Sequence, residues 1–428
     1  MELKSLPSKS IELERSLGVF KGTKVGLALL TLIALNLLNH VGRNIFAGAQ
    51  PVIQKTIHAS DSTMGAVSSW FFIAYMFAAP LLGWLGDRFP RRILVPGCVL
   101  WWSCALGVAT VGRDFHWFSN AYMMVGVAEA AFGVYAIALV SDYYPHANRS
   151  KALSLYILAM TGGRALGFPL GGWLAQTFGW QTPFRFIAGV GILLGLLAMK
   201  FLFEPRTKER LWPGVSSEGN GSAISLRSLW RKSYLFAVLG LAMENFAFGG
   251  LSVWLPTYLH RFAGYSVVHA AGVLAAVALV CGTAGTWTGG LVGEMWLRRD
   301  HRALYWISAV GFFVAVPCVA SILTYSHVPM LCGVVGVNLC LFMNLGPLNA
   351  AILNSVPASM RSTAIAISLF SIHAFGDAIS PRLIGLISDA RGLRLGISAT
   401  IIPLAAGGLF LMAGARGVPH QDAMDDPA

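Results

Sequence analysis

The sequence predicts an all-α integral membrane protein with twelve transmembrane helices, arranged as two six-helix halves. Of its 428 residues, 56% are hydrophobic and only 12% are charged, whereas an ordinary soluble domain carries about 25% charged residues. The apolar residues also fall into long runs of about 20 residues, the length that crosses a bilayer as a helix. Finally, two motifs recur at nearly one offset along the chain, which indicates that the second half repeats the first.

The apolar runs define the predicted helices in order. Lipid-exposed backbone must satisfy its own hydrogen bonds, so each run is expected to be a helix, and the runs are too long and too uniformly apolar for barrel strands. The runs are 25–47, 64–85, 93–111, 117–140, 152–178, 184–203, 234–258, 270–292, 303–323, 329–353, 363–387 and 396–413. The predicted organisation is a tail at 1–24, a bundle at 25–203, a polar Gly/Ser-containing linker at 204–233, a second bundle at 234–413 and a tail at 414–428.

The net charge of +12 is interpreted as a topology signal rather than as a nucleic-acid footprint, because positive residues gather in cytoplasmic loops. With the N-terminus placed inside, 22 of the 31 Lys and Arg residues lie in inner segments, 6 in outer segments and 3 within the spans. We therefore expect both tails and the linker in the cytoplasm, and the chain in the plasma (inner) membrane, with the lipid bilayer as its surroundings.

Two motifs carry the internal repeat. GWLGDRFPRR at 83–92 corresponds to GLVGEMWLRR at 290–299, which lies 207 residues later. The second motif consists of an Asp or Asn, a Pro and an Arg at the same spacing in both halves. It ends at Arg149 in the first half and at Arg361, 212 residues later, in the second. Parallel repeats of this kind place a substrate site between the two halves near the middle of the membrane.

The first of these motifs resembles the loop signature of the major facilitator superfamily. Its matching positions are Gly83, Asp87, Arg88, Arg91 and Arg92. The resemblance covers nearly the whole chain, and it implies the major facilitator fold with two halves that rock around a central site.

Within that superfamily the chain is most similar to the Spinster-type transporters. The helix that reads SIHAFGDAISPRLIGLISD matches their pattern, as do the acid in VGVAEAAF and the arginine in LNHVGRNIFAG. Two positions depart from the pattern, because Gly42 and Tyr122 replace an acidic residue and an arginine. The resemblance implies an organic anion, a lysolipid or a sphingoid phosphate as substrate.

Three residues are candidates for proton coupling, because an ionisable side chain at mid-membrane costs about 2.5 kcal/mol or more and is a functional hypothesis by default. Glu129 lies midway along its predicted helix, where it would either exchange a proton or form a fixed ion pair with Arg43. His373 and Asp377 are four residues apart on one helix face, so they would either relay protons or form a structural pair.

Four residues are candidates for substrate binding. Two guanidinium groups suit a carboxylate or phosphate, so Arg43 and Arg164 are predicted to bind an anion, with internal pairing as the alternative for Arg164. Glu244 and Asn245 lie in the helix that repeats the first one, and are also predicted to bind substrate.

A last group of residues is expected to gate the inner face. The resemblance implies that the loop signature pairs with groups such as Asp142, with ordinary loop charges as the alternative. The predicted gating residues are Gly83, Asp87, Arg88, Arg91, Arg92, Asp142, Arg149, Glu294 and Arg361.

These observations predict a proton-coupled secondary active transporter of a small or amphiphilic organic anion, acting as a monomer. The alternatives are an exporter of lysolipids or hydrophobic drugs, a membrane receptor that binds without flux, and an intramembrane enzyme. No nucleotide-binding loop, metal-ligand cluster or nucleophile motif occurs in the sequence, so neither a cofactor nor a metal is expected and an enzyme is disfavoured.

The charge asymmetry predicts that the linker at 204–233 faces the cytoplasm. In a Cys-free background, a single Cys in this linker should resist a membrane-impermeant thiol reagent in intact cells. A Cys at Ser326, in a predicted outer loop, should label readily. Equal labelling of the two positions would contradict the twelve-helix topology.

Overall fold

The computed structural model describes residues 23–86, 88–112, 114–144, 146–204, 229–324, 326–357 and 360–418. This part of the chain contains 12 helices that are long and apolar enough to cross a membrane. It contains helices and connecting turns, and no strand is assigned within it. The predicted fold class is therefore confirmed.

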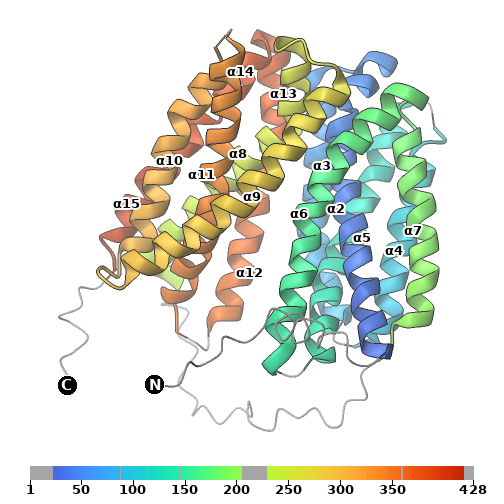
Figure 1. Cartoon of the computed structure of the whole chain (residues 1–428), viewed down its shortest axis with the longest axis horizontal. Helices are drawn as coiled ribbons and strands as arrows, with labels where there is room; N and C mark the ends of the chain where they lie inside the picture. The colour runs from blue at the N-terminus through green and yellow to red at the C-terminus, as the bar shows by residue number, and fades with distance from the viewer. Residues whose placement is uncertain are drawn as a thin grey trace, which may run out of the picture.

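The helices form two halves that stand side by side, the first in blue to green and the second in yellow to red (Figure 1). The N-terminal half comprises α2 (Thr23–Ile57), α3 (Asp61–Gly86), α4 (Arg91–Ala109), α5 (Phe115–Tyr143), α6 (His146–Phe178) and α7 (Thr182–Phe201). The C-terminal half comprises α8 (Lys232–Phe262), α9 (Val267–Leu297), α10 (Ala303–Ile322), α11 (His327–Asn354), α12 (Arg361–Ile372), the π-helix η4 (His373–Asp377), α13 (Ser380–Arg391), α14 (Leu393–Ser398) and α15 (Ile401–Ala415). We call the end of the molecule where α2 begins and α15 ends the tail end, and the opposite end the distal end.

Small residues let the helices of the N-terminal half pack closely, as is typical inside membranes. A Cβ atom added at Gly48 of α2 would lie 2.2 Å from the Phe168 carbonyl oxygen of α6. A Cβ added at Gly171 of α6 would lie 2.4 Å from the Ile45 carbonyl oxygen of α2. The two glycines hold α2 against α6, and this contact places Arg43 and Arg164 on neighbouring helices.

The helix predicted at 363–387 is not continuous, which the uniform apolar pattern did not indicate. It divides into α12, η4 and α13, with Gly376 at φ −104° and ψ −107°. A Cβ at Gly376 would lie 2.9 Å from the Asn245 Cβ and 3.2 Å from the Ala242 carbonyl oxygen, so glycine is needed where this bend meets α8. π-helical turns inside α-helices are frequent at functional sites, and this one carries His373 and Asp377.

The halves are joined at the distal end by a polar cluster that we call the distal clamp. It consists of Gln54, Asp61, Arg261, Ser388 and Asp389. The Arg261 guanidinium donates to both carboxylate oxygens of Asp61, at 2.7 and 2.8 Å. The same carboxylate accepts the Gln54 amide at 2.6 Å and the Ser388 hydroxyl. Asp61 is 7% exposed, so its charge depends on these partners.

The clamp also caps α3 with a side chain from the other half. The Asp389 carboxylate accepts the backbone N–H groups of Asp61 and Ser62, both at 2.9 Å. A carboxylate at a helix N-terminus satisfies otherwise unpaired N–H groups and interacts favourably with the helix dipole. At the tail end, by contrast, the Arg91–Asp142 and Arg298–Glu294 ion pairs each stay within one half. In the described structure, charged hydrogen bonds therefore connect the two halves at the distal end.

Breaking the clamp should favour opening at the distal end. Replacing Arg261→Gln removes charged hydrogen bonds worth about 2 kcal/mol, so the open state should gain roughly thirtyfold in population. Spin labels at Lys55 and Arg391 should then show an added longer distance. Arg185→Gln is a matched control, because Arg185 bonds to Thr110 within its own half. An unchanged distance distribution for Arg261→Gln would contradict the assigned role.

Candidate functional site

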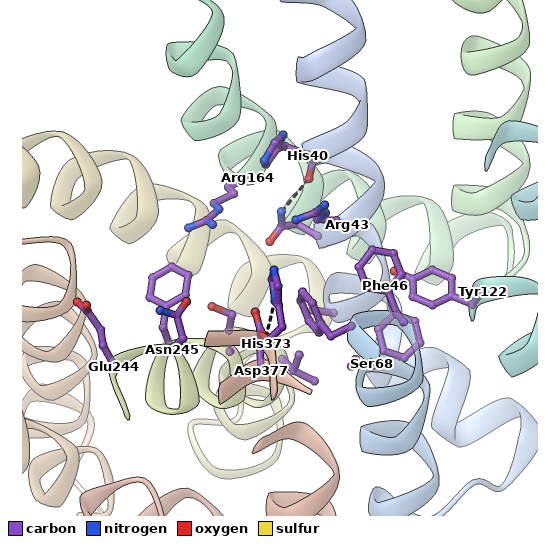
Figure 2. Close-up of a pocket in the computed structure, with 18 of the residues that line it drawn as sticks. His40, Arg43, Phe46, Ser68, Tyr122, Arg164, Glu244, Asn245, His373 and Asp377 are labelled. Atoms are coloured by element: carbon purple, nitrogen blue, oxygen red, sulfur yellow. Dashed lines mark hydrogen bonds and ion pairs between the residues drawn. The ribbon is translucent and has the colours of Figure 1, made fainter. Parts of the chain in front are cut away.

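A cavity of about 240 Å³ lies between the two halves and is lined by residues of both. Arg43 and Arg164 reach it from α2 and α6, while Asn245 on α8 and the His373–Asp377 pair of η4 face them (Figure 2). Aromatic side chains make much of its wall, including Phe46, Phe71, Phe72 and Phe248. Apolar walls with a few convergent polar groups are typical of a small-molecule site.

Arg43 forms an ion pair with Glu129 in the N-terminal half. The Arg43 Nε atom lies 2.6 Å from a Glu129 carboxylate oxygen, and the Glu129 side chain is 3% exposed. The Arg43 guanidinium also lies over the rings of Phe71 and Tyr75, at 5.5 and 4.9 Å from their centroids. Glu129 is thus compensated by Arg43, and Arg43 presents its remaining surface to the cavity, which it lines.

Arg164 differs from Arg43, because no ion pair or hydrogen bond engages its side chain among the described residues. Its guanidinium lies 4.8 Å from the centroid of the Phe248 ring, on α8 of the other half. It lines the central cavity and a second cavity that opens between α6 and α9. A guanidinium that is held in place by an aromatic ring keeps its hydrogen-bond donors available for a ligand.

Asp377 is held by His373 within η4. The His373 Nδ1 atom lies 2.9 Å from an Asp377 carboxylate oxygen, and both side chains are largely buried. The imidazole also packs across the interface between the halves, 5.9 Å from the Phe72 ring centroid and 5.1 Å from that of Tyr75. The pair therefore lies where a movement between the halves would change its surroundings.

Glu244 is buried at the edge of the cavity, and Figure 2 shows its carboxylate pointing away from Arg164 and Asp377. It is 1% exposed, and neither carboxylate oxygen has a hydrogen-bond partner within the described structure. Asn245 faces the cavity and donates its side-chain amide to the Leu241 carbonyl oxygen at 2.9 Å. The two predicted binding residues thus have different surroundings, although they are adjacent in the sequence.

The two positions that depart from the Spinster pattern have simple roles in packing. Tyr122 lies in a buried aromatic cluster, with ring centroids 5.3 Å from Phe46, 5.4 Å from Phe71 and 5.8 Å from Phe118. A Cβ at Gly42 would make ordinary contact with Ile187, at 3.6 Å. Neither residue supplies a charge to the cavity.

Five predicted gating residues of the N-terminal half lie at the tail end, and none of them lines the central cavity. Arg91 donates to Asp142 at 2.7 Å, Arg88 lies over the Trp84 ring at 3.6 Å, and the Arg149 Nε atom is 3.4 Å from the Tyr144 carbonyl oxygen. Arg92 contributes its backbone N–H, which donates to Glu204 at 3.0 Å. The Arg91 and Arg92 contacts connect α4 to α5 and to the residues after α7, all within one half.

The other four predicted gating residues are Glu294, Gly83, Asp87 and Arg361. Glu294 pairs with Arg298 one turn along its own helix, at 2.7 Å. A Cβ at Gly83 would meet open space, whereas one at Gly86 would lie 2.3 Å from the Tyr135 ring, so the close approach falls at Gly86. Asp87 and the side chain of Arg361 lie outside the described residues.

Two features of the site had weak signals in the sequence. The rings over the arginines, Phe71, Tyr75 and Phe248, are ordinary apolar residues by pattern, and only their positions in the folded bundle give them a role. Arg261 was placed in an outer segment by the charge count, but nothing in its spacing indicated Asp61 as its partner. The one sequence signal for this cluster is Asp389, because it belongs to the Spinster-type pattern.

A substrate-sized cavity enclosed between two pseudo-repeated halves defines a secondary transporter. The Major Facilitator Superfamily model matches residues 32–381, so the chain belongs to that superfamily. It is a membrane transporter and not an enzyme, as predicted.

The relatives confirm the Spinster-type resemblance. Protein spinster homolog 3 of Danio rerio is 29% identical over 389 residues, which cover 85% of this chain and 77% of the relative. Sphingosine-1-phosphate transporter SPNS2 of Danio rerio is 28% identical over 417 residues, covering 88% and 81%. A crystal structure of a bacterial homolog to human lysosomal transporter Spinster, in an inward-facing and unoccupied conformation, superposes with a TM-score of 0.80 at 22% identity. It covers 91% of this chain and 96% of that one.

Proposed function

We propose that the chain transports a small or amphiphilic organic anion, coupled to protons, by alternating access of the central cavity. The observation that carries the proposal is the Arg164 guanidinium, which lines the cavity without an acidic partner among the described residues. A charge without a partner inside a membrane-spanning bundle is expensive. A carboxylate or phosphate of the substrate would supply that partner with bidentate hydrogen bonds.

The walls of the cavity support an amphiphilic substrate. Phe46, Phe71, Phe72 and Phe248 offer apolar surface close to the arginines. The similarity to a sphingosine-1-phosphate transporter favours a phosphate-bearing amphiphile within this class.

A specific observation favours export of lysolipids or hydrophobic drugs as the second candidate. A cavity of about 1160 Å³ lies between α6 and α9 and reaches Arg164 at its inner end. Its rim carries exposed Ile157, Leu158 and Trp287. Such an opening admits an alkyl chain from the side, whereas a small hydrophilic anion needs no lateral route.

Protons are proposed to act through the acidic pairs of the two halves. The Glu129 carboxylate exchanges a proton when substrate engages Arg43 and weakens the ion pair, and Asp377 with His373 is the corresponding pair in the other half. Asn245 would contribute to the wall that faces Arg164, and Glu244, whose carboxylate points away from Arg164, would lie at the edge of the site. The tail end is cytoplasmic in this proposal, which rests on the distribution of Lys and Arg. The proposal also takes the protein as a monomer in the plasma (inner) membrane.

Arg164→Ala should weaken substrate binding by about 2–3 kcal/mol, that is, about 30- to 150-fold in Kd. Arg164→Lys should bind with intermediate affinity, because an ammonium lacks the planar fork of donors. A thermal-shift screen of carboxylates, sugar acids, phosphates and lysolipids identifies the ligand, since binding stabilises the folded state.

Arg382→Ala is the matched control for this measurement. Like Arg164, Arg382 lies within a candidate membrane-spanning helix, but its side chain is exposed and does not line the central cavity. The control should bind like the wild type. Normal substrate binding by Arg164→Ala would contradict the proposal that the substrate is an anion bound by Arg164.

Glu129→Gln should abolish substrate accumulation driven by a pH gradient, because the amide keeps the size of the carboxyl but carries no proton. Counterflow of substrate without a gradient should persist, since the rocking movement needs no net proton transfer. Both are measured in proteoliposomes, with melting temperature as a stability control. A purely structural pair predicts instead that stability and counterflow fall together, because Arg43 loses its partner. Undiminished pH-driven accumulation would exclude Glu129 from coupling.

A further inference from the structure

A separate cavity of about 410 Å³ lies at the tail end of the C-terminal half. Its lining comes from the start of α8, the turn before α10, the end of α11 and the residues that follow α15. Three basic side chains line it, Arg231, Lys232 and His301, and no Asp or Glu is among its lining residues. Within the described part of the chain, none of the three forms an ion pair. The cavity thus gathers positive charge without compensation from its own walls.

The floor of this cavity is fixed by hydrogen bonds between three helices. The Tyr305 hydroxyl of α10 donates to the Ser233 carbonyl oxygen of α8 at 3.1 Å. It also lies 2.8 Å from the Ser355 hydroxyl, which follows α11. Tyr305 is only 2% exposed. The inner wall of the cavity is therefore a fixed part of the bundle, while Arg231, Lys232 and His301, which also line it, are exposed.

The internal repeat shows how the other half fills the corresponding place. Glu204 stands three residues after Phe201, the last residue of α7, and its carboxylate accepts the Arg92 N–H at the start of α4 at 3.0 Å. In the C-terminal half, the residue three positions after Ala415, the last residue of α15, is Val418, and it lines the basic cavity next to the start of α10. One half thus supplies its own anion at this place, and the other half has a valine and an open cavity.

The position of the cavity along the membrane indicates the source of an anion. The candidate span of α8 begins at Lys232, and the preceding Trp230 is 75% exposed. Exposed tryptophans next to basic residues mark the interface between a bilayer and water, where lipid head groups lie. Basic pockets between transmembrane helices on the cytoplasmic side suit phosphate-bearing head groups.

We propose that this cavity binds the phosphate group of an anionic phospholipid from the leaflet at the tail end, through Arg231, Lys232 and His301. The phosphate accepts hydrogen bonds from these side chains and takes the place that Glu204 occupies in the other half. The lipid would tie the start of α8 to α10 and α11. This site is separate from the central cavity, so its test does not depend on the transported substrate.

The test measures the melting temperature of the full-length protein in neutral detergent during titration with phosphatidylglycerol, phosphatidylcholine or glycerol 3-phosphate. Phosphatidylglycerol should raise the melting temperature, and the other two should have little effect. The double variant Arg231→Gln/Lys232→Gln should require about thirtyfold more phosphatidylglycerol, since it loses two basic groups near the surface. The control Lys200→Gln/Arg299→Gln removes the same charge at the tail end outside the cavity, and should respond like the wild type.

A substitution that adds an anion sharpens the test. Val418→Glu copies the arrangement of Glu204, so it should raise the melting temperature without lipid and abolish the response to phosphatidylglycerol. An equal response of the double variant and the wild type would overturn the proposal, as would an equal response to phosphatidylcholine. Stabilisation by glycerol 3-phosphate as strong as that by phosphatidylglycerol would overturn the assignment to a lipid. Because the readout is binding, failure here would leave the proposed transport function untouched.

Discussion

The ion pair between Arg43 and Glu129 joins α2 to α5 in the wall of the central cavity, with 2.6 Å between the charged groups. Neither charge is tolerable alone in a membrane-spanning bundle. The pair therefore requires that α2 packs closely on its neighbours. It also requires that the aromatic rings of Phe71 and Tyr75 cover the exposed face of the Arg43 guanidinium. Arg164 is the contrasting case, because its guanidinium lies over a ring and forms no ion pair among the described residues. In the proposed function, a substrate anion completes the compensation at that place.

The two ends of the molecule contribute to this site in different ways. At the distal end, Asp61 and Asp389 each bind groups of the other half, so opening there requires the loss of several charged hydrogen bonds at once. The ion pairs described at the tail end instead brace each half internally. A substrate that pulls Arg43 and Arg164 toward α8 and η4 would act on the interface between halves, because the Arg164–Phe248 and His373–Phe72 contacts both cross it. The proposed function therefore treats binding at the cavity and release of the clamp as parts of one movement.

Much of this architecture could be predicted from the sequence, because the bilayer reduces the choice of structure to long apolar helices. The length of the runs located the spans, and the charges of Arg43, Glu129, Arg164 and Asp377 identified the cavity, since such residues rarely occur in a membrane without a reason. The sequence leaves the pairing of Arg43 with Glu129 as one of two roles for Glu129, because residue spacing does not determine contacts between helices that are far apart in the chain. The bend at Gly376 could not be predicted either, because it results from contact with α8 and not from local pattern. For the same reason the partner of Arg261 emerged only from the packing of α3 against α13.

The central claim is that Arg164 receives the anionic group of the substrate while Arg43 shares its charge with Glu129. A structure of the protein with a ligand found by thermal shift tests this claim most directly. The account predicts that the carboxylate or phosphate of the ligand lies about 3 Å from the Arg164 guanidinium, in the central cavity and within reach of Phe248. A ligand whose anionic group lies elsewhere, with Arg164 still bound to no acceptor, would contradict it.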